Sequence, residues 1–427
     1  MNSAAKKKFM GVEVPDDLKK VNLVTLFICT ALGGIVTNSI NGIQHSYLKD
    51  VLKISDETFG TISGTMMTVA EVAAIVFLTF FGNLSDKKGR KFVVSIGLFF
   101  AAIFYALFYY SYDVANLLGI NPLFLAYAGR FAIVASVAGT WGTYIIITAD
   151  YTDEANRAKG MSLNGIFTGF GMLGAMGIFA NMPRLIGLRN SFFAVAALSV
   201  LTLIFTRLYL VDRIRSHEKH TAKVSDVITA LKESPQMIMC YAARFLVMAA
   251  IITVGTFIFV WAVNEAKNLN VPAEVAQGKV GMYIGIAGMS AFVGFPIFAI
   301  MCDKLGRFKT LSISFALGGL ALLSFGFIKN PIGPAILIPM IAFFISQAGM
   351  LISSQTLAAD LAPKHLTGTL LGGLNTVGQI GAGIFFSIDG IAMDMLGPQS
   401  PFMIVGVCLL AIIPWVLGVE GKVKHKT

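Results

Sequence analysis

Residues 82–91 read Gly-Asn-Leu-Ser-Asp-Lys-Lys-Gly-Arg-Lys, and residues 302–309 read Cys-Asp-Lys-Leu-Gly-Arg-Phe-Lys. Both stretches contain the pattern Asp-Lys-x-Gly-Arg, at 86–90 and at 303–307, about half the chain apart. Each copy separates two apolar runs that are long enough to cross a membrane. A charged turn that recurs at half the length of an apolar chain indicates a duplicated membrane domain, which is a common architecture among transporters.

The composition indicates that most of this chain is surrounded by lipid. Of its 427 residues, 56% are hydrophobic and 13% are charged, whereas soluble domains average about 25% charged residues. The four cysteines are far apart and show no Cys-x-x-Cys or Cys/His spacing. We therefore interpret them as packing residues and predict no metal site and no disulfide framework.

Apolar runs of about 20 residues predict an all-α membrane protein with twelve transmembrane helices in two pseudo-symmetric six-helix bundles. The predicted domains are an N-terminal segment (1–20), an N-terminal bundle (21–211), a charged central loop (212–235), a C-terminal bundle (236–419) and a tail (420–427). The predicted helices cover residues 21–47, 59–83, 91–112, 122–148, 161–182, 190–211, 236–263, 279–302, 309–328, 334–358, 366–391 and 401–419.

The basic charge is distributed unevenly between the two sides of the predicted membrane. Most of the 33 Lys and Arg residues fall in the N-terminal segment, the Asp-Lys-x-Gly-Arg turns, the central loop and the tail. The positive-inside rule places these segments, and hence both termini, in the cytoplasm. The net charge of +10 therefore reflects topology, and we expect no binding of nucleic acid.

The two turns resemble the signature loop of the major facilitator superfamily, Gly-x-x-x-Asp-(Arg/Lys)-x-Gly-Arg-(Arg/Lys). The first copy matches fully from Gly82, and the second has Ala299 in place of the first glycine. This resemblance implies the fold of that superfamily, with the two turns after the second and eighth helices and with alternating access between two bundles. The Gly-Pro pattern of drug/proton antiporters is missing from residues 169–177, which disfavours classical drug efflux.

Residues around each turn form a predicted cytoplasmic gate. We predict that Arg90 pairs with Asp150 and that Arg307 pairs with Asp360, in one conformation only, so that the pairs bias an equilibrium between two states. A simple anchor with a tight turn is the alternative, since an exposed ion pair contributes about 0–1 kcal/mol. The full set of predicted gate residues is Asp86, Gly89, Arg90, Asp150, Asp303, Gly306, Arg307 and Asp360.

Ionisable residues inside the predicted spans are candidates for coupling and binding, because such a residue costs about 2.5–3.5 kcal/mol at the bilayer centre. Glu71 lies in the middle of the second span, where burial favours its protonated form, and we predict proton coupling through Glu71 and Arg130. A static pair of these two residues is the alternative. Arg244 is predicted to bind an anionic solute, or else to extend toward the cytoplasmic interface.

Polar residues in the spans complete the predicted substrate site. Asn38, Asn41 and His45 share one face of the first helix, although His45 could also sit at the outer interface, and one His with one carboxylate makes a poor transition-metal site. Asp389 is expected near the outer end of the eleventh helix, in contact with water. The predicted substrate-binding residues, each of which could instead make an interhelical hydrogen bond, are Asn38, Asn41, His45, Trp141, Asn164, Arg244, Gln347, Asn375 and Gln379.

The sequence predicts secondary active transport of a small polar or anionic organic solute. We do not expect the chain to be an enzyme. No nucleotide-binding Gly-x-x-x-x-Gly-Lys-(Ser/Thr) pattern occurs, so we expect no cofactor and an ion gradient, H⁺, as the driving force. The alternatives are efflux of amphipathic compounds, a metal-ion carrier such as an iron carrier, and a non-transporting receptor or scaffold. We expect a monomer in a bacterial inner or internal membrane.

Overall fold

The structure is a computed structural model that describes residues 8–213, 234–363 and 366–424. Within these ranges, twelve helical segments are long and apolar enough to cross a membrane, which confirms the predicted number. The described residues also include a short antiparallel hairpin near the N-terminus, made of β1 (Lys8–Phe9) and β2 (Val12–Glu13). The fold is therefore the predicted all-α membrane architecture.

Contacts within the chain divide it into two compact units. Unit 1 contains residues 1–53 and 72–217, and unit 2 contains residues 54–71 and 218–427. Most of the predicted central loop (212–235) lies outside the described residues. Residues 54–71 include the first half of the second span and belong to unit 2, while the helix continues unbroken into unit 1.

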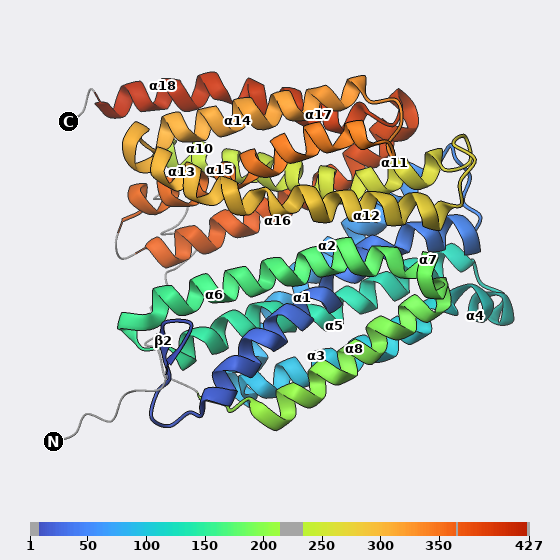
Figure 1. Ribbon diagram of the computed structural model, residues 1–427, viewed down its shortest axis with the longest axis horizontal. Helices are drawn as coiled ribbons and strands as arrows, with labels where there is room; N and C mark the ends of the chain where they lie inside the picture. Colours follow the sequence, from blue (N-terminus) through green and yellow to red (C-terminus); the bar gives the residue numbers. More distant parts are fainter. Residues whose placement is uncertain (1–7, 214–233, 364–365, 425–427) are drawn as a thin grey trace. The chain divides into compact units, whose positions relative to one another are not determined.

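Unit 1 contains the first six spans (Figure 1). The second span, α2, is shared with unit 2, and short π-helical and 3₁₀ segments extend the first and fifth spans. The elements are α1 (Lys20–Ser46), η1 (Tyr47–Val51), α2 (Phe59–Lys88), α3 (Arg90–Tyr109), α4 (Ser111–Leu118), α5 (Pro122–Tyr151), α6 (Glu154–Leu173), η2 (Gly174–Ile178), η3 (Phe179–Asn181), α7 (Met182–Ile186) and α8 (Leu188–Tyr209).

Unit 2 contains the last six spans, and a π-helical segment interrupts the seventh. The elements are α10 (Pro235–Ile252), η4 (Thr253–Phe257), α11 (Ile258–Glu265), α12 (Ala273–Met289), α13 (Ala291–Leu305), α14 (Arg307–Ser324), η5 (Phe325–Phe327), η6 (Pro334–Ile336), α15 (Leu337–Leu361), α16 (Thr367–Leu396), α17 (Ser400–Ala411) and α18 (Ile413–Lys424).

The two units repeat the same pattern of helix neighbours. In unit 1, α1 packs against α5, α6 and α8, and α3 packs against α5 and α8. In unit 2, α10 packs against α15, α16 and α17, and α14 packs against α15 and α17 (Figure 1). Each pair in unit 2 corresponds to a pair in unit 1 displaced by six spans, as a duplicated six-helix domain predicts.

Glycine at the two repeated turns lets one helix end and the next begin without a loop. Gly89 has φ 98° between α2 and α3, and Gly306 has φ 86° between α13 and α14. Only glycine adopts such values without steric cost. The same backbone conformation at both copies therefore explains why each copy in this chain has a glycine between aspartate and arginine.

Candidate functional site

The first repeated turn holds a buried arginine between two aspartates of unit 1. The Arg90 side chain is 7% exposed, and its Nη1 donates to Asp86 Oδ1 at 2.8 Å and to the Ser85 carbonyl at 2.9 Å. Its Nε lies 3.5 Å from Oδ2 of Asp150, which is 2% exposed. The predicted pairing of Arg90 with Asp150 is thus present, at a buried position.

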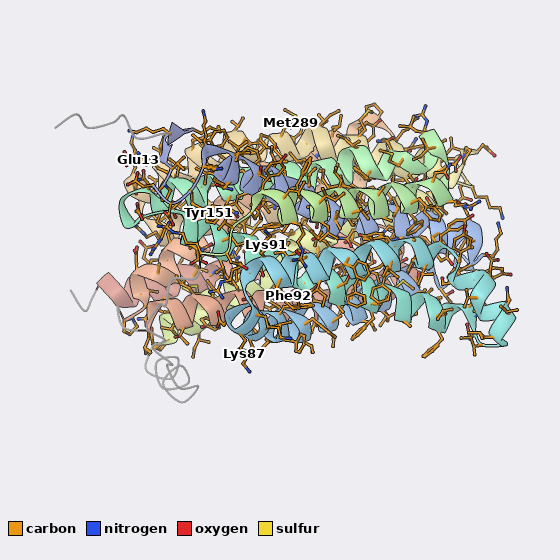
Figure 2. All side chains as sticks on the ribbon, turned by 90° about the horizontal axis from the view of Figure 1, so that it is seen from below. Glu13, Lys87, Lys91, Phe92, Tyr151 and Met289 are labelled. Carbon is orange, nitrogen blue, oxygen red and sulfur yellow. The ribbon has the colours of Figure 1, made fainter. Side chains whose placement is uncertain are left out.

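A further aspartate, absent from the sequence prediction, completes this turn. Asp212 follows α8 in the chain, and its Oδ1 accepts a hydrogen bond from the Lys91 backbone N–H at 2.8 Å. A Cβ on Gly89 would lie 2.6 Å from the Asp212 carboxylate, so the glycine is also needed for this close approach. Figure 2 labels Lys87 and Lys91, which lie on either side of this turn.

The segment that follows α8 is hydrogen-bonded to α5 near the same turn. The Tyr151 hydroxyl donates to the Val211 carbonyl at 2.9 Å and accepts from the Val211 N–H at 2.7 Å. Arg213 pairs with Asp17 at 2.7 Å and donates to the Asp150 carbonyl at 3.0 Å. These contacts connect the start of α1, the end of α5 and the end of α8 in one polar network.

The second repeated turn makes the corresponding ion pair in unit 2 with less burial. Arg307 pairs with Asp360, as predicted, but their side chains are 37% and 50% exposed. Asp303, the counterpart of Asp86, is exposed to solvent. Asp86 is exposed as well, so the two copies differ in the burial of the other ion pair: Arg90 and Asp150 are buried, whereas Arg307 and Asp360 are not.

Arg130 lies at the centre of a buried polar cluster in unit 1. Its side chain is 3% exposed, and its Nη2 donates to Asn41 Oδ1 of α1 at 2.5 Å. His45, on the same helix, is fully buried within unit 1 and close enough to Arg130 for electrostatic interaction. Gln44 is also fully buried, and its amide nitrogen and oxygen have no hydrogen-bond partner among the described residues.

Arg244 occupies a comparable position in unit 2. Its side chain on α10 is 9% exposed, and its Nη2 donates to Asn375 Oδ1 of α16 at 2.9 Å. Its Nε and Nη1 have no hydrogen-bond partner among the described residues. Each unit thus contains one buried arginine that is oriented by an asparagine from a neighbouring helix.

The remaining predicted site residues differ in their surroundings. Glu71 is half-buried in α2 and packs against Gly383 of α16. Asn164 donates to Thr148 at 2.9 Å and to Thr30 at 3.4 Å, which supports the interhelical alternative for this residue. Asn38 donates to the Gly34 carbonyl within its own helix, Gln347 and Gln379 are half-buried, and the side chain of Trp141 lies outside the described residues.

The environment of Asp389 differs from the one that the sequence predicted. Asp389 was expected near water at the outer end of a span, but its side chain in α16 has no exposed surface. The expectation was wrong because α10, η4 and α17 all pack around this part of α16. Asp389 Oδ2 lies 2.5 Å from Thr253 Oγ1, at the first residue of the π-helical segment η4.

The first half of α2 makes a very close contact with α16 inside unit 2, which the sequence analysis missed. Asp394 accepts hydrogen bonds from the backbone N–H groups of Gly60 and Thr61 at 2.8 and 2.6 Å. A carboxylate is favourable at this helix N-terminus. Two turns further along α2, Thr68 Oγ1 lies 2.7 Å from Ser387 Oγ. The signal was present in the sequence as Gly60-x-x-x-Gly64, a pattern that permits close helix packing.

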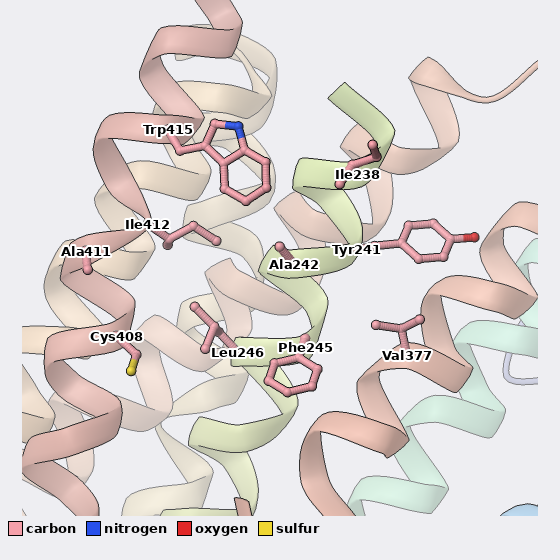
Figure 3. A pocket seen from close by; sticks show the side chains of 10 residues that line it. All are labelled: Ile238, Tyr241, Ala242, Phe245, Leu246, Val377, Cys408, Ala411, Ile412 and Trp415. Atoms are coloured by element: carbon pink, nitrogen blue, oxygen red, sulfur yellow. The ribbon is translucent and has the colours of Figure 1, made fainter. Parts of the chain in front are cut away.

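Unit 2 also contains an apolar groove of about 630 Å³ (Figure 3). Its walls come from α10, α16, α17 and α18, and it could accept an acyl chain or another apolar group. The lining side chains are Ile238, Tyr241, Ala242, Phe245, Leu246, Val377, Cys408, Ala411, Ile412 and Trp415.

Comparisons with known proteins agree with this architecture. The family model described as Major Facilitator Superfamily matches residues 26–386. The magnetosome protein MamH of Paramagnetospirillum magneticum is 26% identical, over 92% of this chain and 91% of MamH. The magnetosome protein MamZ of the same organism is 24% identical over 96% of this chain, which spans only 65% of MamZ. The multidrug resistance protein MdtG of Proteus mirabilis is 22% identical over 75% of this chain and 77% of MdtG.

Solved structures share the fold at low sequence identity. The crystal structure of the nucleoside transporter NupG superimposes with a TM-score of 0.72 and 15% identity, over 94% of this chain and 99% of NupG. The transporter PepTSo superimposes with a TM-score of 0.70 and 11% identity, over 95% of this chain and 99% of PepTSo.

Proposed function

This chain belongs to the major facilitator superfamily, and we infer its function from that membership. The chain is a multi-pass membrane transporter and not an enzyme. We propose that it works by alternating access, that it carries a small polar or anionic organic solute, and that a proton gradient drives it, with Glu71 and Arg130 in the coupling. We also propose that it acts as a monomer with both termini in the cytoplasm.

The observation that supports an anionic solute is the environment of Arg244. A guanidinium group keeps its charge in proteins, and a buried charge is costly unless it is paired. No ion pair to Arg244 occurs in the ranges that the structure describes, and two of its nitrogens lack hydrogen-bond partners there. A carboxylate or phosphate group would supply both a counter-charge and acceptors for a bidentate contact.

The polar cluster of unit 1 supports a solute with hydrogen-bonding groups. Leaving a buried amide without partners costs about 1–3 kcal/mol. Gln44 is in this position among the described residues, on the helix that also presents Asn41 to Arg130. Hydroxyl or carbonyl groups of a solute would satisfy such an amide.

Replacement of Arg244 tests the proposed substrate class. Purified protein in liposomes would be screened with a panel of labelled mono-, di- and tricarboxylates and organic phosphates under a pH gradient. We expect Arg244→Gln to lower uptake of the transported anion about tenfold or more, since loss of a charged hydrogen bond costs about 1.5–3 kcal/mol. Arg207→Gln, at an exposed position in α8, is the control. Equal uptake by both variants would contradict the role of Arg244.

Efflux of amphipathic compounds is the second candidate, and two observations favour it. MdtG is named as a multidrug resistance protein, and the groove of Figure 3 is lined almost entirely by apolar side chains. A metal-ion carrier has no comparable support, as no group of three His, Cys, Asp or Glu side chains in the described residues could hold a metal ion. If the protein transports a lipophilic cation at the same rate in the wild type and in Arg244→Gln, this result would favour efflux.

The magnetosome membrane is the proposed location. The support is the name of two relatives, MamH and MamZ, as magnetosome proteins. Fractionation of magnetosomes from the remaining inner membrane, followed by detection of the tagged chain, tests this proposal. Exclusive recovery in the remaining inner membrane would contradict it.

A further inference from the structure

The side chain of Asp389 is enclosed entirely within unit 2. It has no exposed surface, and its Oδ1 atom has no hydrogen-bond partner among the described residues. The other oxygen, Oδ2, lies 2.5 Å from Thr253 Oγ1.

The Thr253 hydroxyl has two oxygen atoms within hydrogen-bond distance but only one hydrogen atom. Thr253 Oγ1 lies 2.8 Å from the Ala249 carbonyl oxygen as well as 2.5 Å from Asp389 Oδ2. A hydroxyl group donates only one hydrogen bond, and a carbonyl oxygen can only accept. If Thr253 donates to Ala249, the short contact with Asp389 is a hydrogen bond only when the carboxyl group is the donor. Both contacts are complete hydrogen bonds only if Asp389 is protonated, because a carboxylate has no hydrogen atom to donate.

The neighbours of Asp389 give no alternative means of holding a negative charge. Among the described residues, the titratable groups on α10, α17, the first half of α2 and α16 itself are Cys240, Tyr241, Arg244, Cys408, Glu71 and Asp394. Cys408 is close enough to Asp389 for electrostatic interaction, and the guanidinium of Arg244 is bound to Asn375. On α15, Asp360 pairs with Arg307. No ion pair to Asp389 is found in the described ranges. An ionised carboxylate in this position would be an uncompensated buried charge, which is strongly unfavourable.

The position of Thr253 connects this proton to the shape of the seventh span. Thr253 is the first residue of η4, the π-helical segment between α10 and α11, and every residue of η4 is buried. Short π-helical segments inside α-helices are frequent at functional sites. Loss of the proton from Asp389 would reverse this hydrogen bond, so that Thr253 would have to donate to Asp389 and could no longer donate to the Ala249 carbonyl.

We propose that Asp389 is a proton-binding site of unit 2, and that its hydrogen bond to Thr253 couples the proton to the packing of α16 against η4. Asp389 binds the proton while it is enclosed, and it releases the proton only after α16 and η4 separate enough to admit water. The coupling to transport rests on the function proposed above, whereas the protonation itself does not.

Infrared spectroscopy of the purified protein in detergent tests the protonation without any substrate. At neutral pH we expect a carbonyl band of a neutral carboxylic acid that is present in the wild type and missing in Asp389→Asn. Asp394→Asn, five residues along α16, should keep this band, because Asp394 accepts two backbone hydrogen bonds as a carboxylate. An unchanged band in Asp389→Asn would overturn the proposal.

Two variants of Thr253 test the hydrogen bond. Thr253→Val removes the acceptor and should shift the Asp389 band to higher frequency, whereas Thr253→Ser keeps the hydroxyl and should leave the band in place. Equal spectra for both variants would show that Thr253 does not bind Asp389. A thermal unfolding curve for each variant confirms that it is folded.

Transport measurements separate this proposal from the proposed function. If the wild type transports an anion of the panel, Asp389→Asn should lose accumulation driven by the pH gradient and keep exchange of labelled for unlabelled anion. Full gradient-driven accumulation by Asp389→Asn would contradict the coupling. If the wild type transports none of the panel, the proposed substrate class fails, while the infrared result still decides the protonation of Asp389.

Discussion

Gly64→Ala is expected to lower transport about tenfold or more, whereas Gly82→Ala in the same helix should leave it unchanged. A Cβ on Gly64 would lie 2.1 Å from the Phe386 carbonyl oxygen and 3.2 Å from Gly390 Cα. These are backbone atoms of α16, and they cannot rotate away as a flexible side chain could. Nothing lies within 4 Å of a Cβ on Gly82.

The size of this effect follows from the cost of overpacking. Inserting a methyl group into a well-packed contact costs about 1–3 kcal/mol, and each 1.4 kcal/mol changes a population or a rate about tenfold. The cost applies only to the conformation in which α2 and α16 touch. If the contact forms and breaks during alternating access, Gly64→Ala should depopulate one state and slow the cycle, while the fold survives.

Initial rates of uptake into liposomes measure the Gly64 effect, and size-exclusion chromatography confirms that both variants are folded. Reaction of Thr68→Cys with a water-soluble thiol reagent provides a second readout, since the hydroxyl of Thr68 is held against Ser387 and the Gly383 carbonyl. We expect faster labelling when Gly64→Ala is also present. Wild-type uptake together with unchanged labelling would show that the α2–α16 contact plays no part in transport.

Arg90→Gln is expected to destabilise the protein by about 3 kcal/mol, and Arg307→Gln by less than about 1 kcal/mol. Removing one partner of a buried ion pair costs about 3–5 kcal/mol because the other charge is left without compensation. Exposed pairs contribute about 0–1 kcal/mol. Arg90 is enclosed with Asp150, whereas Arg307 and Asp360 are much more exposed.

Thermal unfolding in detergent, followed by tryptophan fluorescence, compares these two variants. The substitutions are chemically identical and occur at equivalent positions of a repeated motif, so each serves as a control for the other. Equal losses of stability would contradict the difference in burial. A lower stability for Arg307→Gln than for Arg90→Gln would contradict it more strongly.

The sequence predicted the features that depend on local pattern. Span length and hydrophobicity were sufficient for the twelve helices, and the repeated pattern was sufficient to place tight turns at Gly89 and Gly306. The pairing of Arg90 with Asp150 could also be predicted, because the duplicated motif is followed by a duplicated aspartate two helices later.

The sequence did not predict features that depend on which helices meet. Asp389 lies near the end of an apolar run, where exposure is the usual outcome, and only the packing of α10, η4 and α17 encloses it. The division of α2 between two units depends on contacts of Gly60 and Gly64 with α16, more than 300 residues away in the chain. Asp212 follows the last span of its bundle, and its role at the turn before α3 required the folded structure.

One measurement tests alternating access in this chain most directly. A disulfide between Thr68→Cys and Ser387→Cys, in a background without the four native cysteines, would fix α2 to α16 where their hydroxyl groups lie 2.7 Å apart. The account predicts that uptake of the transported anion stops when this pair is oxidised and returns when it is reduced. Equal uptake in the oxidised and reduced protein would contradict it.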